Sequence, residues 1–440
     1  KSGAPRRPAD NIVIVVIDTV RYDVFGPWNP NGRVPTPAYD AFAEAGTVFM
    51  NAYNNENWTK PSCATLLSGL YPSTHGTKSS KAKLPKDVEI LPETLKEAGF
   101  STGAFVANGY VSAHFGFDQG WDRLLNYIRK NKPSHAAAVY KDALAWAKKR
   151  KAAGERFLLY VQTIDPHVAY SVPKKWWRPF YKGTYKGKLG KAVDGYEVGR
   201  IKGRKQRVSA DDKAWMRALY DGEVAYHDHH MGRFFEGLEA AGITDDNTVF
   251  LITNDHGEEF FDHGLCGHGH SLHEEMVRAP LAIRFPRAFP PGRRVDSVVE
   301  HVDVMPTLLD MVRVKRPDGL EGVSLVDALK ERRRFAPGYA VIEFLDGWRS
   351  VRVGPVKYMR SRAGKDRLFD LSTDPGEQKE LGDAAPVALR LASIHLGEGL
   401  ASSPKWARLR GGVAGKRRKA VEAELSGEIK RQLEALGYAN

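Results

Sequence analysis

Residues Asn11–Asp18, with the sequence NIVIVVID, decide the fold class. Six β-branched apolar residues follow Asn11 without interruption, and a carboxylate ends the run. Such a run is typical of a parallel strand that is buried on both faces. Ligands of open α/β sheets bind beyond the carboxyl ends of these strands, so Asp18 is the first candidate functional residue.

The chain up to about residue 330 continues this pattern of alternating strands and helices. It predicts an α/β fold with a mainly parallel central sheet between helices. Further strands are expected at Val48–Tyr53, Ser101–Ala107, Phe157–Ile164, Thr248–Ile252 and Leu281–Arg284. Helices are expected at Thr36–Ala45, Pro61–Leu67, Leu91–Ala98, Ala136–Lys149 and Ala214–Ala241.

The last quarter of the chain has a different pattern, with short alternating segments separated by turns. It predicts a small C-terminal antiparallel sheet, followed by a helix within Ala420–Leu436. The expected strands are Ala340–Phe344, Trp348–Val353, Val356–Arg360 and Asp366–Asp370. We therefore expect a linker at residues 1–10, a catalytic domain at 11–330 and a C-terminal subdomain at 331–440.

The composition excludes several classes of protein. Hydrophobic residues make up 42% of 440, which is enough for a large core, and no apolar run reaches the length of a membrane span. The two cysteines cannot build a disulfide framework, and no nucleic-acid module is recognisable. The net charge of +13 favours an anionic substrate, although a solvated basic surface is an equal alternative. An exported or membrane-tethered protein is expected over a cytoplasmic one; the start at Lys1 in place of Met is only compatible with this. The oligomeric state is left open.

Candidate metal ligands stand where strands end and one helix begins. Asp18 and the pair Asp255–His256 follow buried strands, and Thr59 precedes the helix that Pro61 is expected to start. Two carboxylates, a hydroxyl and an imidazole can form a four-ligand metal site, which would make Thr59 a nucleophile. Alternatively, each Asp is a turn residue and Thr59 only an N-cap.

Eight stretches in order along the chain carry a family resemblance. They are Asn11–Asp23, Trp58–Gly76, Tyr220–Tyr226, Thr253–Glu258, His268–Pro280, His301–Leu309, Leu368–Glu377 and Leu436–Tyr438. Together they resemble the sulfatase family of the alkaline phosphatase superfamily. The resemblance implies the fold of that superfamily and metal-dependent ester hydrolysis through a covalent intermediate.

The chain departs from true sulfatases at its nucleophile. Sulfatases begin this helix with a Cys or Ser that is oxidised to formylglycine, and they carry an Arg four residues later. Here Thr59 and Cys63 occupy these positions, and oxidation of a Thr would give a ketone. The chain thus resembles the branch with an unmodified nucleophile, which includes phosphodiesterase or phosphonate monoester hydrolase enzymes and lipoteichoic-acid synthase-like transferases.

One divalent metal ion is expected. Many sulfatases have Asn or Gln where this chain has His256, and a nitrogen ligand favours Mn or Zn, with Ca or Mg as alternatives. The ligands would be Asp18, Thr59, Asp255 and His256.

The resemblance also implies residues that contact the substrate. His167 would contact its oxygens, unless it is an ordinary loop residue, and Asn108 would bind an equatorial oxygen, unless it forms a turn. His268 or His270 would donate a proton to the leaving group, with a slight preference for His270. Lys60 is expected to be solvated, and His263 is a weaker candidate.

Three functions remain open. The first is a hydrolase or phosphotransferase that acts on phosphate or phosphonate esters through Thr59. The second is a sulfatase without formylglycine. The third is a pseudo-enzyme that binds anionic glycans, which the missing Arg at position 63 would favour.

Overall fold

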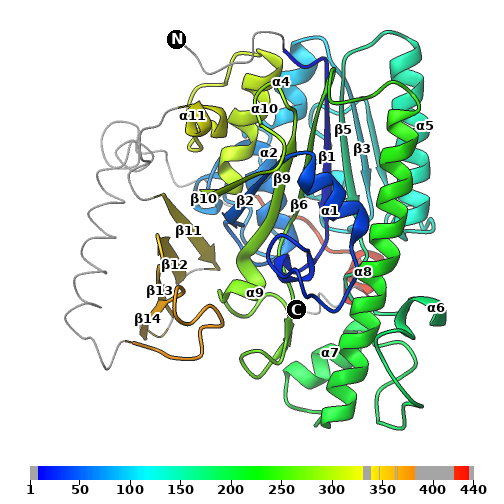
Figure 1. Cartoon of the computed structure of the whole chain (residues 1–440), viewed down its shortest axis with the longest axis vertical. Helices are drawn as coiled ribbons and strands as arrows, with labels where there is room; N and C mark the ends of the chain where they lie inside the picture. The colour runs from blue at the N-terminus through cyan, green and yellow to red at the C-terminus, as the bar shows by residue number, and fades with distance from the viewer. Residues whose placement is uncertain are drawn as a thin grey trace.

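The computed structural model describes residues 8–330, 338–345, 347–361, 363, 365–381 and 421–435. Its centre is an eight-stranded sheet in the order β10-β2-β9-β6-β1-β5-β3-β4 (Figure 1). Only β9 is antiparallel to its neighbours, β2 and β6, so the predicted mainly parallel sheet is confirmed. The strands are β1 (Asn11–Ile17), β2 (Thr47–Tyr53), β3 (Ser101–Val106), β4 (Arg123–Asn126), β5 (Phe157–Thr163), β6 (Thr248–Asn254), β9 (Arg278–Arg284) and β10 (Arg293–Glu300).

Strand β1 lies in the middle of this sheet and is buried on both faces. Ile12, Ile14 and Val16 contribute to one hydrophobic core, and the residues between them contribute to a second core on the opposite face. All seven residues of the strand are buried. This two-sided burial explains why the run contains no polar residue after Asn11.

Helices cover both faces of the sheet. Helices α1 (Pro37–Glu44), α5 (Ala136–Ala152) and α8 (Ala210–Glu239) pack on one face, and α2 (Thr59–Ser68), α4 (Leu91–Glu97) and α10 (Val304–Val312) pack on the other (Figure 1). The other helices before residue 331 are η1 (Tyr22–Val24), α3 (Pro72–His75), η2 (Ala113–Phe115), α6 (Lys174–Trp177), α7 (Gly195–Lys202), α9 (Glu274–Val277), η3 (His301–Asp303) and α11 (Leu325–Lys330).

The predicted C-terminal sheet is also confirmed. Its four strands, in the order β11-β12-β13-β14, are all antiparallel. They are β11 (Tyr339–Phe344), β12 (Trp348–Val353), β13 (Val356–Arg360) and β14 (Asp366–Asp370). The helix that follows, α14 (Gly427–Ala435), is shorter than expected because residues 421–426 are not helical.

The C-terminal sheet shares a hydrophobic core with the large sheet. Ile342, Met359 and Phe369 belong to the same cluster as the apolar residues of α2 and α10. The division of the chain at residue 330 stays a prediction. Within the described ranges, no helix is long and apolar enough to span a bilayer.

The start of α2 differs from the expectation. The helix begins at Thr59 rather than Pro61, and its N-cap is Trp58, so the N-cap interpretation of Thr59 is wrong. Pro61 is tolerated in the first turn, where its missing N–H would have no partner within the helix. Gly69 ends the helix in the left-handed conformation, which glycine adopts without strain.

Candidate active site

The parallel pairing of β1 with β6 brings the two strand-end carboxylates together. Ile17 is paired with Asn254, so Asp18 and Asp255 follow at the same edge of the sheet. Ligand atoms of Asp18, Asp255 and His256 all lie within 4.8 Å of one another, and all three side chains are buried.

These residues suit a cation. Burial and the charge of Asp255 raise the pKa of Asp18 well above its ordinary value. Among the described residues, Oδ1 of Asp18 has no hydrogen-bond partner. Two adjacent buried carboxylates are costly unless a cation offsets their charge, and oxygen and imidazole ligands fit a divalent ion.

Thr59 lies beside this group, at the start of α2. Its Oγ1 is 3.2 Å from Nε2 of His256 and 3.3 Å from Nδ2 of Asn108. Asn108 follows the end of β3, and its amide also donates to Oδ2 of Asp18 at 2.6 Å. The structure thus brings all four predicted metal ligands and Asn108 together. The N-terminus of α2 also favours negative charge at this point.

Two further histidines line the same site. The ring of His268 lies 4.5 Å from that of His256 and 4.9 Å from that of His167, measured between centroids. Burial and His268 lower the pKa of His167 to about 3, and burial, His256 and Lys202 lower the pKa of His268 well below its usual range. An anionic group in the site would oppose these effects and favour the protonated rings.

His270, the slightly preferred proton donor, lies in a different environment. Its Nε2 is 2.6 Å from Oε2 of Glu259. The two ring contacts to His167 and His256 are made by His268. The geometry therefore assigns His268, rather than His270, to the group around Thr59.

Two polar residues at this site were not expected from the sequence. Glu258 is buried, and its Oε1 lies 3.0 Å from Nδ1 of His268. Gln162 donates from Nε2 to Oδ2 of Asp255 at 3.3 Å. A polar residue near the end of the buried run Phe157–Thr163 was the signal that could have identified Gln162.

The expectation that Lys60 is solvated is wrong. Its side chain is buried, and Nζ donates to the carbonyl of Ser80 at 2.7 Å. Nζ also lies 4.1 Å from the ring centroid of Phe115 and 4.8 Å from that of Tyr110. The carbonyl and the rings replace water around the amine. Lys60 therefore points into the core, beside the predicted nucleophile.

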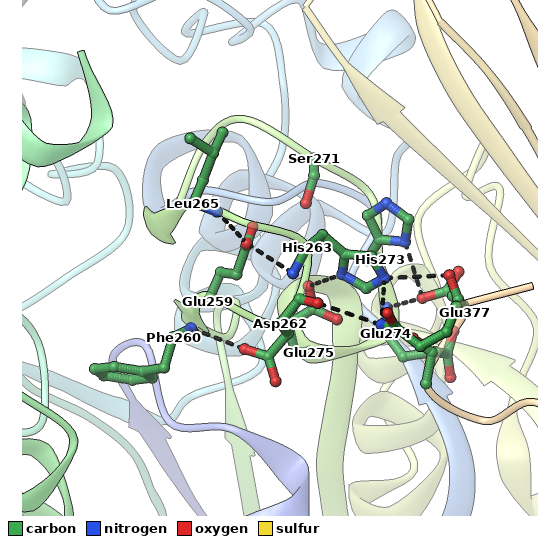
Figure 2. A network of polar contacts seen from close by, with 12 residues as sticks. Glu259, Phe260, Asp262, His263, Leu265, Ser271, His273, Glu274, Glu275 and Glu377 are labelled. Atoms are coloured by element: carbon green, nitrogen blue, oxygen red, sulfur yellow. Dashed lines mark hydrogen bonds and ion pairs between the residues drawn. The ribbon is translucent and has the colours of Figure 1, made fainter. Parts of the chain in front are cut away.

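His263 belongs to a buried polar network that Figure 2 shows. Its Nδ1 lies 2.9 Å from Oε1 of Glu275, and its ring stacks on that of His273 at 3.5 Å. His273 in turn pairs with Glu377, which comes from the C-terminal segment. Lys357 of β13 forms ion pairs with Glu377 at 2.9 Å and Glu274 at 3.0 Å. The network anchors the loop that carries His268 and His270 to the C-terminal sheet.

Comparison with known protein families agrees with the sequence resemblance. Residues 10–314 match the Sulfatase family model, and residues 261–393 match the model described as N-sulphoglucosamine sulphohydrolase, C-terminal. An arylsulfatase of Clostridium perfringens is 26% identical, over 84% of this chain and 90% of the relative. An ulvan-active sulfatase of Formosa agariphila is 26% identical, over 86% of this chain and 77% of the relative.

Solved structures share the fold. The phosphonate monoester hydrolase of Silicibacter pomeroyi aligns with a TM-score of 0.73 at 20% identity, over 91% of this chain and 97% of that one.

Proposed function

This chain belongs to the sulfatase family, and we propose that it is a metal-dependent hydrolase of phosphate or phosphonate esters with Thr59 as its nucleophile. The observation that carries the proposal is the position of Thr59 Oγ1, 3.2 Å from His256 and 3.3 Å from Asn108 at the start of a helix. A hydroxyl held against a buried pair of carboxylates and an imidazole has the surroundings of a metal-activated nucleophile.

One divalent ion would be held by Asp18, Asp255, His256 and Thr59. When bound, the ion would lower the pKa of the Thr59 hydroxyl and offset the negative charge of the substrate. Mn or Zn is favoured by the nitrogen of His256, and Ca or Mg are the alternatives.

The protein's own residues then define a two-step reaction. The deprotonated Thr59 oxygen forms a bond to phosphorus while the bond to the leaving oxygen breaks, and that oxygen takes a proton from His268. Asn108 and His167 would donate hydrogen bonds to the other oxygens on phosphorus. The oxygen of water, or of an acceptor alcohol in a phosphotransferase, then bonds to phosphorus as the bond from phosphorus to Thr59 breaks, and a proton of that water or alcohol passes to His268.

Phosphorus is favoured over sulfur because Thr59 cannot be converted to formylglycine. Cys63, where sulfatases carry Arg, is buried with Sγ 3.6 Å from the hydroxyl of Tyr160 and 3.7 Å from Oε1 of Gln162. The names of the relatives support the alternative, a sulfatase without formylglycine.

A substrate panel tests the choice. Turnover of 4-nitrophenyl phosphodiesters, phosphonates and sulfates would be measured with each metal and with a chelator. We expect metal-dependent turnover of the phosphorus esters, faster than that of the sulfate. Faster sulfate turnover would instead establish the sulfatase. Binding of heparin-like polymers without turnover of any ester would indicate a glycan-binding pseudo-enzyme. Export of the protein stays a prediction.

A further inference from the structure

Two neighbouring glutamates each hold one of two nearby histidines. Glu258 and Glu259 follow the predicted metal ligand His256 after one glycine, and they pair with His268 and His270. The contacts use different ring nitrogens. Oε1 of Glu258 lies 3.0 Å from Nδ1 of His268, whereas Oε2 of Glu259 lies 2.6 Å from Nε2 of His270.

The first pair lies beside the predicted nucleophile. His268 contacts the ring of His256, whose Nε2 is 3.2 Å from Oγ1 of Thr59. Glu258 is 0% exposed, and Lys202 of α7 donates from Nζ to the backbone carbonyl of His268. The histidine is thus held through both its side chain and its backbone.

We propose that Glu258 is a positioning residue that accepts a hydrogen bond from Nδ1–H of His268, so that Nε2 is the nitrogen presented to the leaving oxygen. The inference rests on the proposed role of His268 as proton donor. A carboxylate can only accept a hydrogen bond, so it fixes the proton on Nδ1 and the orientation of the ring.

The proton balance follows from this arrangement. In the first step the proton on Nε2 moves to the leaving oxygen as its bond to phosphorus breaks, and His268 becomes neutral. In the second step the oxygen of a water molecule bonds to phosphorus as the bond from phosphorus to Oγ1 of Thr59 breaks. One proton of the water moves to Nε2, and the electron pair of the broken bond returns to Oγ1. His268 ends the cycle protonated, and neither step moves a proton to or from Glu258.

The experiment compares leaving groups of different basicity. A 4-nitrophenolate leaves without protonation, whereas an alkoxide needs a proton, so an oriented acid matters only for the alkyl ester. We expect Glu258→Gln to lower kcat/KM for the alkyl ester at least about tenfold and kcat/KM for the 4-nitrophenyl ester less than about threefold. The ratio kcat/KM is compared because it reports only the steps up to phospho-Thr59, before the hydrolysis that both esters share. An equal loss for both esters would show a merely structural role and overturn the proposal.

Glu259→Gln is the matched control. It replaces a carboxylate by an amide at the adjacent residue, which pairs with His270 instead of His268. This control should leave the ratio of kcat/KM for the alkyl ester to kcat/KM for the 4-nitrophenyl ester unchanged. In the double variant Glu258→Gln/His268→Asn, the alkyl ester should react no more slowly than in His268→Asn alone, since the two residues act as one unit. Additive losses would contradict the proposal.

A second measurement does not depend on activity. In protein with ¹⁵N-labelled histidine, the NMR signal of an Nδ1-bound proton should be absent in His268→Asn, shifted in Glu258→Gln and unchanged in Glu259→Gln. A proton found only on Nε2 of His268 would overturn the assignment. If the enzyme prefers sulfate esters, the same two leaving groups are compared as sulfates. The proposed phosphorus specificity then fails without affecting the conclusion on Glu258. If no ester is hydrolysed, the proposed function fails, and the NMR signals alone decide the hydrogen bond.

Discussion

Oγ1 of Thr59 lies 3.2 Å from Nε2 of His256, although 197 positions separate the two residues in the chain. One residue begins a helix and the other follows the carboxyl end of a strand. Both side chains are buried, so the fold brings two distant polar residues into contact away from solvent. The proposed chemistry can be tested at each partner separately.

Replacement of Thr59 by Ala should abolish turnover and leave the fold intact. Removal of a nucleophile should lower kcat at least about a thousandfold. The loss of one hydroxyl and methyl should cost only about 1 kcal/mol of stability. Thr59→Ser keeps a hydroxyl and should retain most of the activity. Residual activity above about a tenth of wild type in Thr59→Ala would exclude Thr59 as the nucleophile.

Replacement of Asp255 by Ala should remove the bound metal. Asp255 supplies one of the two buried carboxylates, and a site with one carboxylate fewer binds divalent cations more weakly. Elemental analysis after gel filtration should show about one metal per wild-type chain and much less in the variant. Glu275→Gln, which changes a buried carboxylate outside this set, should keep its metal. Full occupancy in Asp255→Ala would refute the ligand assignment.

Thr59 should be unmodified in the mature protein, and activity should not depend on a maturation enzyme. Mass spectrometry of the peptide from Trp58 to Lys78 is expected to show an intact Thr59 and a free Cys63. Cys63→Ser should remain active, because a hydroxyl can replace the thiol near Tyr160 and Gln162. An aldehyde at position 63 would transfer the nucleophile assignment to Cys63 and make the sulfatase the leading function.

Lys357→Met should destabilise the protein strongly. Lys357 is 0% exposed and bridges Glu274 and Glu377, so its removal leaves two buried carboxylates with one cationic partner fewer. Loss of one partner of a buried ion pair typically costs about 3–5 kcal/mol. Lys365→Met removes a solvent-exposed lysine that pairs with Glu380 and should cost less than about 1 kcal/mol. Similar unfolding free energies for the two variants in urea would contradict the structural role of the network.

Stability should fall at alkaline pH because of His263. Burial alone would lower its pKa, but the hydrogen bond and charge of Glu275 and the nearby Glu377 raise the pKa to about 9. The raised value means that the charged ring stabilises the folded state fully below about pH 6.5 and that this contribution is lost as the pH rises through 9. The Tm of wild type should decline between pH 7 and 10 more steeply than that of His263→Gln. Parallel profiles would exclude this explanation.

The sequence predicts most of this fold because the buried positions of strands and helices carry apolar residues in a recognisable pattern along the chain. The bounds of β12, β13 and β14 agree with the expected ranges residue for residue. Strand β10 was missed because five of its eight residues are not buried, which leaves no apolar run. Strand β4 was missed because it is a short edge strand with one buried residue.

The candidate site was predictable only in part. Asp18, Asp255 and Thr59 stand at the ends of regular elements, where their neighbourhood follows from the topology of the sheet. His268 and His270 lie in a loop, and both follow glycines with positive φ, Gly267 and Gly269. Their orientations depend on their carboxylate partners in the folded loop, which spacing in the sequence does not encode.

The pairing of β1 with β6 also affects how the protein folds. More than half of the chain separates Asp18 from Asp255, so a nascent chain cannot assemble the ligand set until β6 has been synthesised. Contacts of such long sequence separation form slowly, because a large loop must close first. A cation that binds only the completed site favours the native state by mass action. Refolding in the presence of metal should therefore increase the yield of native protein, while the earliest collapse of the chain proceeds at the same rate.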